Sequence, residues 1–196
     1  MEEFERLGAT YIELLSDWSD YLYDAEMLAS VKGKKMNKKR NHVNHFVSCN
    51  PEWKFEPLTS ANAIEAMKFM DIYEAEADET FMAREESRLS RIMINMLAEG
   101  DSVMKGGVLY SAPDKICAIT IGDVKGDTLF VHIEKGTREV AGSYEMINKE
   151  YAAYMTSLNP EIKYINREDD SGDEGLRRAK ESYHPIALLR KYNVIL

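Results

Sequence analysis

The sequence has few of the residues that mark disulfide-rich, low-complexity or membrane-spanning chains. Its 196 residues include two cysteines, five prolines and 11 glycines. No apolar run approaches the roughly 18 residues of a membrane span, and the acidic start lacks the apolar core of a secretory signal. Cys49 and Cys117 lie far apart, which argues against a disulfide framework or a zinc ribbon. We therefore predict a cytoplasmic protein without a transmembrane segment.

The chain contains enough apolar residues for a folded core. Its charges are unevenly distributed along the sequence. The hydrophobic fraction is 44% and the net charge is −9, whereas proteins that bind nucleic acid over their whole surface are more often basic. Residues 1–31 hold eight acids and one base, but residues 32–42 hold six bases and no acid. This basic run is either a solvated helix face or a contact for a phosphate-rich partner.

Hydrophobic periodicity and turn residues divide the chain into helices and strands. Helices are predicted at 10–30, from within the basic run to 47, and at 59–76, 78–98, 144–156 and 175–182. Strands are predicted at 54–58, 106–110, 116–121, 128–134, 163–166 and 188–196. The order predicts an α+β (mixed α/β) fold with an antiparallel sheet centre. A boundary near residues 48–54 separates a helical segment, 1–50, from a sheet-containing domain, 51–196.

Six ordered segments carry a resemblance to a known family. They are DYLYD at 20–24, GKKMNKKRNHVNHF at 33–46, FEPLT at 55–59, FVHIEKG at 130–136, YINREDD at 164–170 and GLRRAKESYHP at 175–185. The element order resembles the GNAT acyltransferase fold, and the segments resemble an uncharacterised bacterial GNAT-like family similar to the C-terminal domain of phosphatidylglycerol lysyltransferase. The resemblance implies a mostly antiparallel sheet whose fourth and fifth strands splay apart, flanked by helices.

The same resemblance implies a missing part. Members of usual length carry another GNAT-like lobe before the DYLYD segment, whereas only about twenty residues precede it here. We therefore expect a one-lobe version or a fragment. If the missing lobe forms half of the substrate cleft, either a homodimer replaces it or the activity is lost.

A donor loop is implied after the fourth strand. GNAT enzymes bind the pyrophosphate of acyl-CoA on backbone amides at a helix N-terminus. The corresponding segment is 138–143, where Ala141 replaces an expected Gly, Ser143 replaces an expected Gly or Ala, and Glu139 has the wrong charge for a phosphate. The candidate donor-binding residues are Thr137, Arg138, Gly142 and Ser143. The alternative is an ordinary strand-to-helix turn capped by Ser143.

The fourth strand carries candidate catalytic side chains. His132 and Glu134 point to one face of a strand, and either is a candidate base for removing a proton from an amine or hydroxyl. The alternatives are a buried His–Glu pair, or a salt bridge from Glu134 to Lys135 or Arg167. By resemblance to GNAT enzymes, Tyr183 is the candidate acid for the leaving group.

Polar residues near the fifth strand are candidates for orienting a substrate. Asn166 and Arg167 end the strand, and Arg167 suits a carboxylate because its guanidinium can bind in a bidentate manner. Arg177 and Lys180 lie three apart on the following helix and share a face. The alternative is a strand-end cap with surface ion pairs. The acidic loop at 169–175 lacks the spacing of an EF-hand.

The basic run supplies the candidate phosphate contacts, which give affinity without reading a nucleic-acid sequence. The residues are Lys34, Lys35, Lys38, Lys39 and Arg40. His42 and His45 have a spacing compatible with a metal, but no third ligand lies nearby in the sequence, so no metal site is predicted.

These observations predict a GNAT-like acyl or aminoacyl transferase, and the resemblance supplies this prediction. The donor is either acyl-CoA or aminoacyl-tRNA, and the degenerate loop favours the second or an unknown donor. The acceptor is an amine or hydroxyl of a small molecule or lipid. The alternatives are a non-catalytic binding protein that kept the fold, and a nucleic-acid-binding module.

Overall fold

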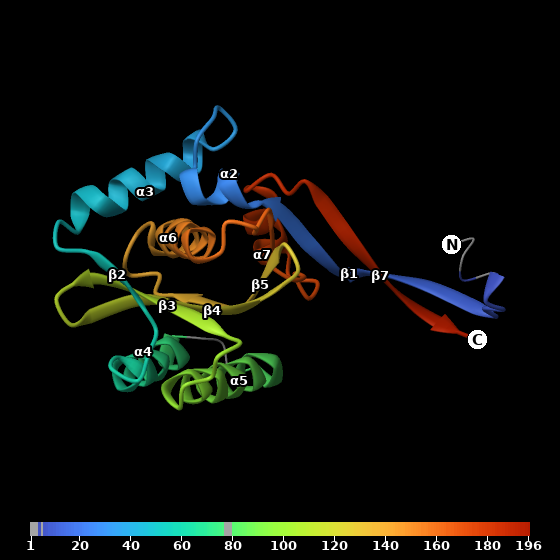
Figure 1. Cartoon of the computed structure of the whole chain (residues 1–196), viewed down its shortest axis with the longest axis horizontal. Helices are drawn as coiled ribbons and strands as arrows, with labels where there is room; N and C mark the ends of the chain where they lie inside the picture. Colours follow the sequence, from blue (N-terminus) through green and yellow to red (C-terminus); the bar gives the residue numbers. More distant parts are fainter. Residues whose placement is uncertain (1–3, 5, 77–79) are drawn as a thin grey trace.

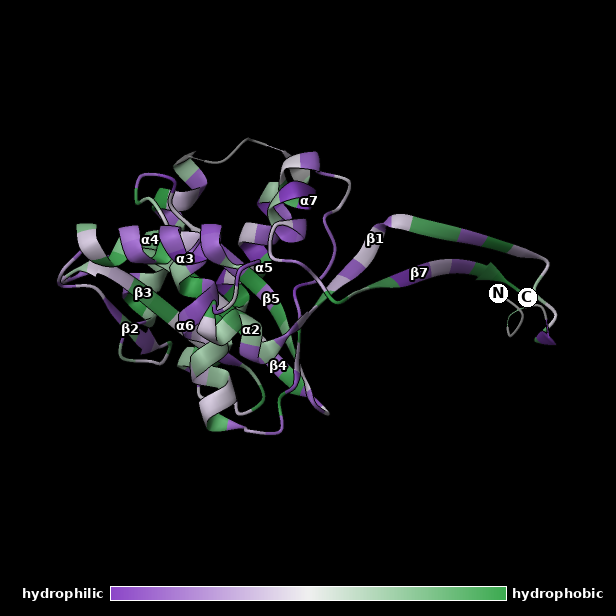
Figure 2. Cartoon of the chain, turned by 90° about the horizontal axis from the view of Figure 1, so that it is seen from above, coloured by the Kyte–Doolittle hydropathy of each residue, from purple (hydrophilic) through white to green (hydrophobic). Residues whose placement is uncertain are grey.

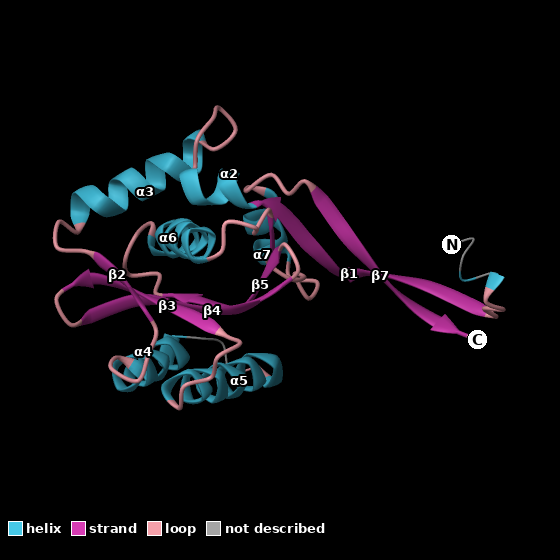
Figure 3. Ribbon diagram, in the orientation of Figure 1, coloured by secondary structure: helices cyan, strands magenta, loops and turns pink. Residues whose placement is uncertain are grey.

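The computed structural model of the protein describes residues 4, 6–76 and 80–196, which form one seven-stranded sheet between two layers of helices (Figure 1). The strands are β1 (Tyr11–Asp24), β2 (Lys54–Pro57), β3 (Lys105–Ala112), β4 (Lys115–Lys125), β5 (Thr128–Gly136), β6 (Tyr164–Asn166) and β7 (Ala187–Ile195). The helices are α2 (Ala25–Ser30), α3 (Asn37–Cys49), α4 (Ala63–Glu76), α5 (Phe81–Ala98), α6 (Ser143–Leu158) and α7 (Glu174–Glu181). Figure 3 shows α2, α3 and α6 over one face of the sheet, and α4 and α5 over the other.

The sheet has the order β2-β3-β4-β5-β6-β1-β7 and is mostly antiparallel. Among the described strands, only β5 and β6 are parallel neighbours, and they pair over three residues, from Thr128↔Tyr164 to Phe130↔Asn166. Because β6 ends at Asn166 while β5 runs on to Gly136, the two strands separate beyond this short ladder. The predicted mixed α/β fold with two splayed strands is confirmed.

Apolar side chains fill both spaces between the sheet and its helices. On the α4 and α5 side, Phe69, Met70 and Ile94 pack against Val108 and Ile119 of the sheet. On the other side, clusters that include Tyr23, Leu28, Phe46, Ile147 and Ile165 join α2, α3 and α6 to the sheet. Burying a side chain of this size contributes about 1.5–3 kcal/mol, so these two layers fix the strands that carry the site.

The helix predicted at residues 10–30 is wrong for most of its length. Residues 11–24 form β1, and only 25–30 form a helix, α2. The side chain of Asp24 starts that helix by accepting a hydrogen bond from the backbone N–H of Met27 at 2.7 Å. Strand β1 pairs with β6 and β7 in the common sheet. The division of the chain at residue 50 stays a prediction, although its first part is not wholly helical.

The misprediction has a physical cause, because the first half of β1 is not packed on the core. With β7 it forms a two-stranded arm that projects from the body, and apolar residues lie along both of its strands (Figure 2). Tyr11, Leu14 and Trp18 are exposed there, whereas Tyr21 and Tyr23 are buried nearer the body. A register irregularity between Leu15 and Asp20 further disturbs the two-residue period of a strand.

The other predicted elements are confirmed within a few residues. The helix predicted at 78–98 is α5, which begins at Phe81, and residues 78–79 of that prediction lie outside the described part of the chain. In the described residues, no helix is long and apolar enough to span a membrane.

Candidate functional site

The candidate site lies where β5 and β6 separate, and its centre is a buried ion pair. Arg167 follows directly after β6, and its Nη2 donates to Oε1 of Glu134 on β5 at 2.6 Å. The other oxygen of Glu134 accepts from Asn148 Nδ2 on α6 at 3.1 Å. The side chains of Arg167 and Glu134 are only 11% and 12% exposed. The salt bridge expected as one alternative for Glu134 is therefore present, with Arg167 as its partner.

Aromatic rings enclose the guanidinium of Arg167. Its carbon atom lies 4.7 Å from the ring centre of Tyr183 and 5.7 Å from that of Tyr23, distances at which a cation is attracted to the ring. Burial raises the pKa of Tyr183 well above its usual value, because the phenolate would lose its hydration. The Tyr183 phenol therefore keeps its proton at neutral pH.

The basic run divides into two kinds of residue. Lys39 is inside the site: its Nζ lies 3.9 Å from the ring centre of Tyr183 and 3.2 Å from Oε1 of Glu145 on α6, and burial lowers its pKa. Arg40 donates to the backbone oxygens of Val31 and Gly33 at 3.1 and 3.2 Å, so it stabilises the turn between α2 and α3.

The remaining three lysines of the predicted contact lie at the surface. Lys34, Lys35 and Lys38 are exposed, and no carboxylate of the described chain forms an ion pair with them. Their charges are therefore free to meet a phosphate, whereas Lys39 and Arg40 are engaged within the fold.

Lys180 on α7 holds the loop that carries Arg167. Its Nζ donates to the backbone oxygens of Arg167 at 2.5 Å, Glu168 at 3.2 Å and Asp169. Burial lowers the pKa of Lys180 to about 8. Asn166 supports the same loop by accepting a hydrogen bond from the backbone N–H of Glu168 at 2.7 Å. Asn166 and Lys180 therefore position Arg167 through the backbone.

His132 contacts two carboxylates on either side of its ring. Its Nδ1 lies 2.6 Å from Oε1 of Glu168 and its Nε2 lies 3.4 Å from Oδ2 of Asp123. The hydrogen bond with Glu168 is the main cause of a raised pKa for His132. The acidic partners of His132 are thus Glu168 and Asp123, whereas Glu134 is bonded to Arg167 and Asn148.

Arg177 lies outside the group formed by Arg167, Glu134 and Tyr183 and has other hydrogen-bond partners. It donates to Asp170 at 2.9 Å and to Asp17 of β1 at 2.8 Å, while Tyr21 donates to Asp170 at 2.6 Å. The hydrogen bond from Arg177 lowers the pKa of Asp170 to about 2. Arg177 therefore ties α7 to the base of the arm.

The predicted donor loop is closely packed against α3. Gly142 is the N-cap of α6 with φ = 83°, and an added Cβ would lie 2.6 Å from the backbone oxygen of His42, so only glycine fits. Ser143 is not the cap that the alternative expected: it is the first helical residue, and its hydroxyl donates to the backbone oxygen of Thr137 at 3.0 Å. Thr137 is buried, whereas Arg138 is exposed.

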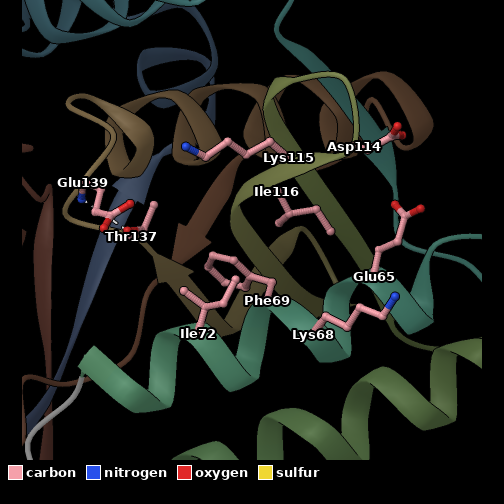
Figure 4. A pocket seen from close by; sticks show the side chains of 9 residues that line it. All are labelled: Glu65, Lys68, Phe69, Ile72, Asp114, Lys115, Ile116, Thr137 and Glu139. Atoms are coloured by element: carbon pink, nitrogen blue, oxygen red, sulfur yellow. Dashed lines mark hydrogen bonds between the residues drawn. The ribbon is translucent and has the colours of Figure 1, made fainter.

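A cavity of about 360 Å³ lies on the α4 side of the sheet, at the end of the same loop (Figure 4). Phe69, Ile72 and Ile116 point into it and form an apolar floor. Charged and polar side chains form its rim, namely Glu65, Lys68, Asp114, Lys115, Thr137 and Glu139. Thr137 and Glu139 therefore border this cavity as well as belonging to the segment expected to bind the donor.

The sequence reasoning missed Asn148, which belongs to the centre of the site. It sits in α6 beside the buried Met146 and Ile147 and is itself buried. A carboxamide on the core-facing side of an otherwise apolar helix stripe is the signal that could have identified it. No group of three or more His, Cys, Asp or Glu side chains in the described chain is arranged to hold a metal ion.

The sheet and its diverging strands define the fold. The mixed α/β arrangement is the GNAT-like acyltransferase fold, as predicted. A family model described as phosphatidylglycerol lysyltransferase, C-terminal, matches residues 1–195. The chain belongs to this family, which confirms the resemblance carried by the six sequence segments.

An uncharacterised protein of Mycoplasmoides gallisepticum is 24% identical to this chain, over 98% of this chain and 61% of that protein. A conserved protein of unknown function from Bacteroides thetaiotaomicron has 34% identity and a TM-score of 0.79, over 93% of this chain and 60% of that one. The C-terminal domain of a putative lysylphosphatidylglycerol synthetase from Agrobacterium fabrum has 14% identity and a TM-score of 0.65, over 98% of this chain and 63% of that one. This chain thus spans about 60% of the length of the first two relatives.

Proposed function

We propose that this chain carries the transfer site of an aminoacyl or acyl transferase, which moves an acyl group to an amine or hydroxyl. The observation that carries the proposal is the buried Glu134–Arg167 pair at the point where β5 and β6 separate. Family membership supports it, since the family description names a lysyltransferase. A phosphatidylglycerol-like lipid is accordingly the first acceptor to test, beside small amines.

The proposed mechanism is a direct transfer without a covalent enzyme intermediate. The nitrogen or oxygen of the acceptor attacks the carbonyl carbon of the donor, a C–N or C–O bond forms, and the ester or thioester bond breaks. Glu134 accepts the proton of the acceptor. Arg167 stabilises the negative charge that develops on the carbonyl oxygen. Tyr183, which is protonated at neutral pH, supplies a proton to the leaving group.

His132 is the alternative base. Its contacts with Glu168 and Asp123 raise its pKa, so it is protonated over a wider pH range than an ordinary histidine. A raised pKa lowers the fraction of neutral imidazole that can accept the proton of the acceptor, which favours Glu134 for this role. Asn166 and Lys180 act as positioning residues, because they hold the backbone that carries Arg167.

Aminoacyl-tRNA is the donor that we favour over acyl-CoA. The three exposed lysines, Lys34, Lys35 and Lys38, offer charge to a nucleic-acid backbone. The predicted donor loop is less suited to a pyrophosphate, because α3 packs closely on Gly142 at the N-terminus of α6. Arg138, Thr137 and Ser143 remain the residues to test for acyl-CoA.

A binding experiment separates these donors. We expect the triple change Lys34→Glu, Lys35→Glu and Lys38→Glu to weaken tRNA binding at least tenfold and to reduce its salt dependence. The matched control is Arg84→Glu, Lys125→Glu and Arg190→Glu, which changes the net charge equally at exposed basic residues outside the candidate site. An equal loss of tRNA binding in both triple variants would mean that tRNA is attracted non-specifically to the charge of the protein. Stabilisation by acetyl-CoA that Arg138→Glu abolishes would identify the other donor.

A non-catalytic binding protein is the second candidate function. The observation that favours it is the burial of Arg167, Glu134 and Tyr183 at the strand separation, which leaves their side chains largely covered. Binding of charged tRNA without transfer to any acceptor would support this candidate. The homodimer and the cytoplasmic location stay predictions.

A further inference from the structure

The cavity on the α4 side of the sheet is separate from the site around Glu134. Glu134 bonds Asn148 of α6, and α6 covers the opposite face of the sheet from α4 (Figure 3). The cavity is lined instead by α4 and the start of β4, and its volume of about 360 Å³ lies in the range of small-molecule pockets. A molecule that reaches Glu134 therefore does not occupy this cavity, and the lining of the cavity itself indicates what it binds.

The floor of the cavity is apolar and comes from two elements. Phe69 and Ile72 of α4 and Ile116 of β4 point into it (Figure 4). Ile72 is 56% exposed, although it is a large apolar side chain. Removing such a surface from water is favourable in proportion to the apolar area that is covered. The floor therefore suits a short hydrocarbon group.

The rim carries carboxylates that no cation of the described chain neutralises in an ion pair. These carboxylates belong to Glu65, Asp114 and Glu139. Lys68 follows Glu65 by three positions on α4 and still forms no ion pair with it. Together with Lys115, the rim holds three carboxylates and two ammonium groups. This excess of negative charge favours a cationic ligand over an anionic one.

Glu65 is the carboxylate of the rim that the fold holds in place. It is half-buried, and its Oε2 accepts a hydrogen bond from the phenol of the buried Tyr110 at 2.9 Å. Burial, and then the hydrogen bond to Glu65, raise the pKa of Tyr110, so the phenol keeps its proton and remains a donor. A carboxylate fixed at the edge of an apolar floor is preorganised for a further charge-assisted hydrogen bond. Lys68 and Lys115 are exposed by contrast, and their long side chains let the ammonium groups stay in water.

We propose that this cavity binds a small organic cation, an alkylammonium whose charged end bonds Glu65 and whose hydrocarbon part lies on Phe69, Ile72 and Ile116. The amine bound here is not the acceptor of the transfer, because the cavity and Glu134 lie on opposite faces of the sheet. The inference therefore goes beyond the proposed function and does not depend on it.

Four compounds with a six-carbon body test the class of ligand. They are hexylamine, hexanol, hexanoate and norleucine, and their binding to the intact chain is followed by amide shifts in an NMR titration at neutral pH. We expect hexylamine to bind at least about tenfold more tightly than hexanol, and hexanoate to bind more weakly than either. Norleucine should bind more weakly than hexylamine, because its carboxylate meets a rim with an excess of negative charge. Amide shifts should centre on residues 65–72 and 114–116.

Several results would overturn the proposal. They are equal binding of hexylamine and hexanol, tighter binding of hexanoate or norleucine than of hexylamine, no saturable binding of hexylamine, and shifts that centre on another part of the chain.

Two pairs of variants locate the binding. Glu65→Gln keeps an acceptor for Tyr110 and should reduce the preference for hexylamine over hexanol to less than about threefold, while Glu161→Gln, at an exposed glutamate elsewhere, should leave it unchanged. Ile72→Arg places a cation on the floor and should abolish hexylamine binding, whereas Ile64→Arg, at another exposed isoleucine of α4, should not. A preference that survives Glu65→Gln, or tight binding of hexylamine to Ile72→Arg, would contradict the assignment. Both isoleucines are exposed, so their replacement leaves the core intact.

Binding in the cavity and transfer can fail separately. Hexylamine should bind Glu134→Gln as tightly as it binds the wild type, although that variant lacks the proposed base of the transfer. Loss of hexylamine binding in folded Glu134→Gln would place the amine at Glu134 and overturn the proposal. Absence of transfer in a wild-type protein that binds hexylamine would remove the transferase and leave the cavity assignment standing.

Discussion

The strand separation around Arg167 and the arm of β1 and β7 both reverse the usual distribution, in which charged residues are exposed and apolar residues are buried. Near Arg167, charged side chains are buried and bonded to each other. Along the arm, large apolar side chains lie in solvent, with Trp18 at 50% exposure. Buried charges and exposed apolar groups are the informative exceptions in a folded protein. The first region depends on precise pairing, whereas the second depends mainly on the backbone ladder between its strands.

The largest expected difference between the two regions is in stability. Glu134→Ala leaves the buried guanidinium of Arg167 without its carboxylate, so we expect the free energy of unfolding to fall by about 3–5 kcal/mol. Trp18→Ala removes an exposed side chain of the arm and should cost less than about 1 kcal/mol, in the range of surface substitutions. Urea unfolding measures both.

The double variant Glu134→Leu, Arg167→Met is the control for this comparison. Replacing both charges with apolar groups of similar size should recover most of the lost stability. If Glu134→Ala and Trp18→Ala lower the free energy of unfolding equally, the proposed difference between the two regions is wrong. A large loss from Trp18→Ala alone would mean that the arm is packed against another surface in solution.

A smaller effect is expected at the base of the arm, where Asp170 links α7 to β1. Its pKa is lowered to about 2, mainly by the hydrogen bond from Arg177. A carboxyl whose pKa is lowered by folding stabilises the protein above its unfolded pKa, and this contribution is lost as the pH falls towards the folded value. The stability of the wild type should therefore drop between pH 4 and pH 2.

Variants at this link sharpen the prediction. Asp170→Asn should flatten the drop in that pH range, and Asp17→Asn, which removes the more exposed partner of Arg177, should flatten it less. The measurement is urea unfolding at several pH values. An unchanged pH dependence in Asp170→Asn would show that other carboxyls carry the effect.

The sequence predicted the body of the fold better than the arm. In strands such as β4 and β5, apolar residues alternate with polar ones or follow one another, because helices cover both faces of the sheet. The apolar pattern of these strands therefore predicts which residues are buried. The first half of β1 lies on the projecting arm with most of its apolar side chains exposed, and its apolar residues at 11, 14, 15 and 18 imitate helical spacing. No local pattern distinguishes such an arm from an amphipathic helix.

The site was predicted in part, because sequence shows residue types and not their partners. Glu134, Arg167 and Tyr183 were all named as candidates, and the structure brings them together. Lys39 belonged to a run of lysines, and its burial against Tyr183 and Glu145 depends on tertiary packing that the run does not reveal. Asn148 was missed because a single carboxamide in a helix has no motif around it.

The central claim is that Glu134 and Arg167 form a transfer site, and a transfer assay tests it most directly. Bulk tRNA charged with radiolabelled amino acids is mixed with excess protein and with phosphatidylglycerol vesicles or a small amine, and the label on the acceptor is measured. We predict transfer by the wild type and a loss of at least 100-fold in Glu134→Gln, which keeps the shape of the side chain but removes the base. Absence of transfer to every acceptor by folded wild-type protein, or full activity of Glu134→Gln, would contradict the account.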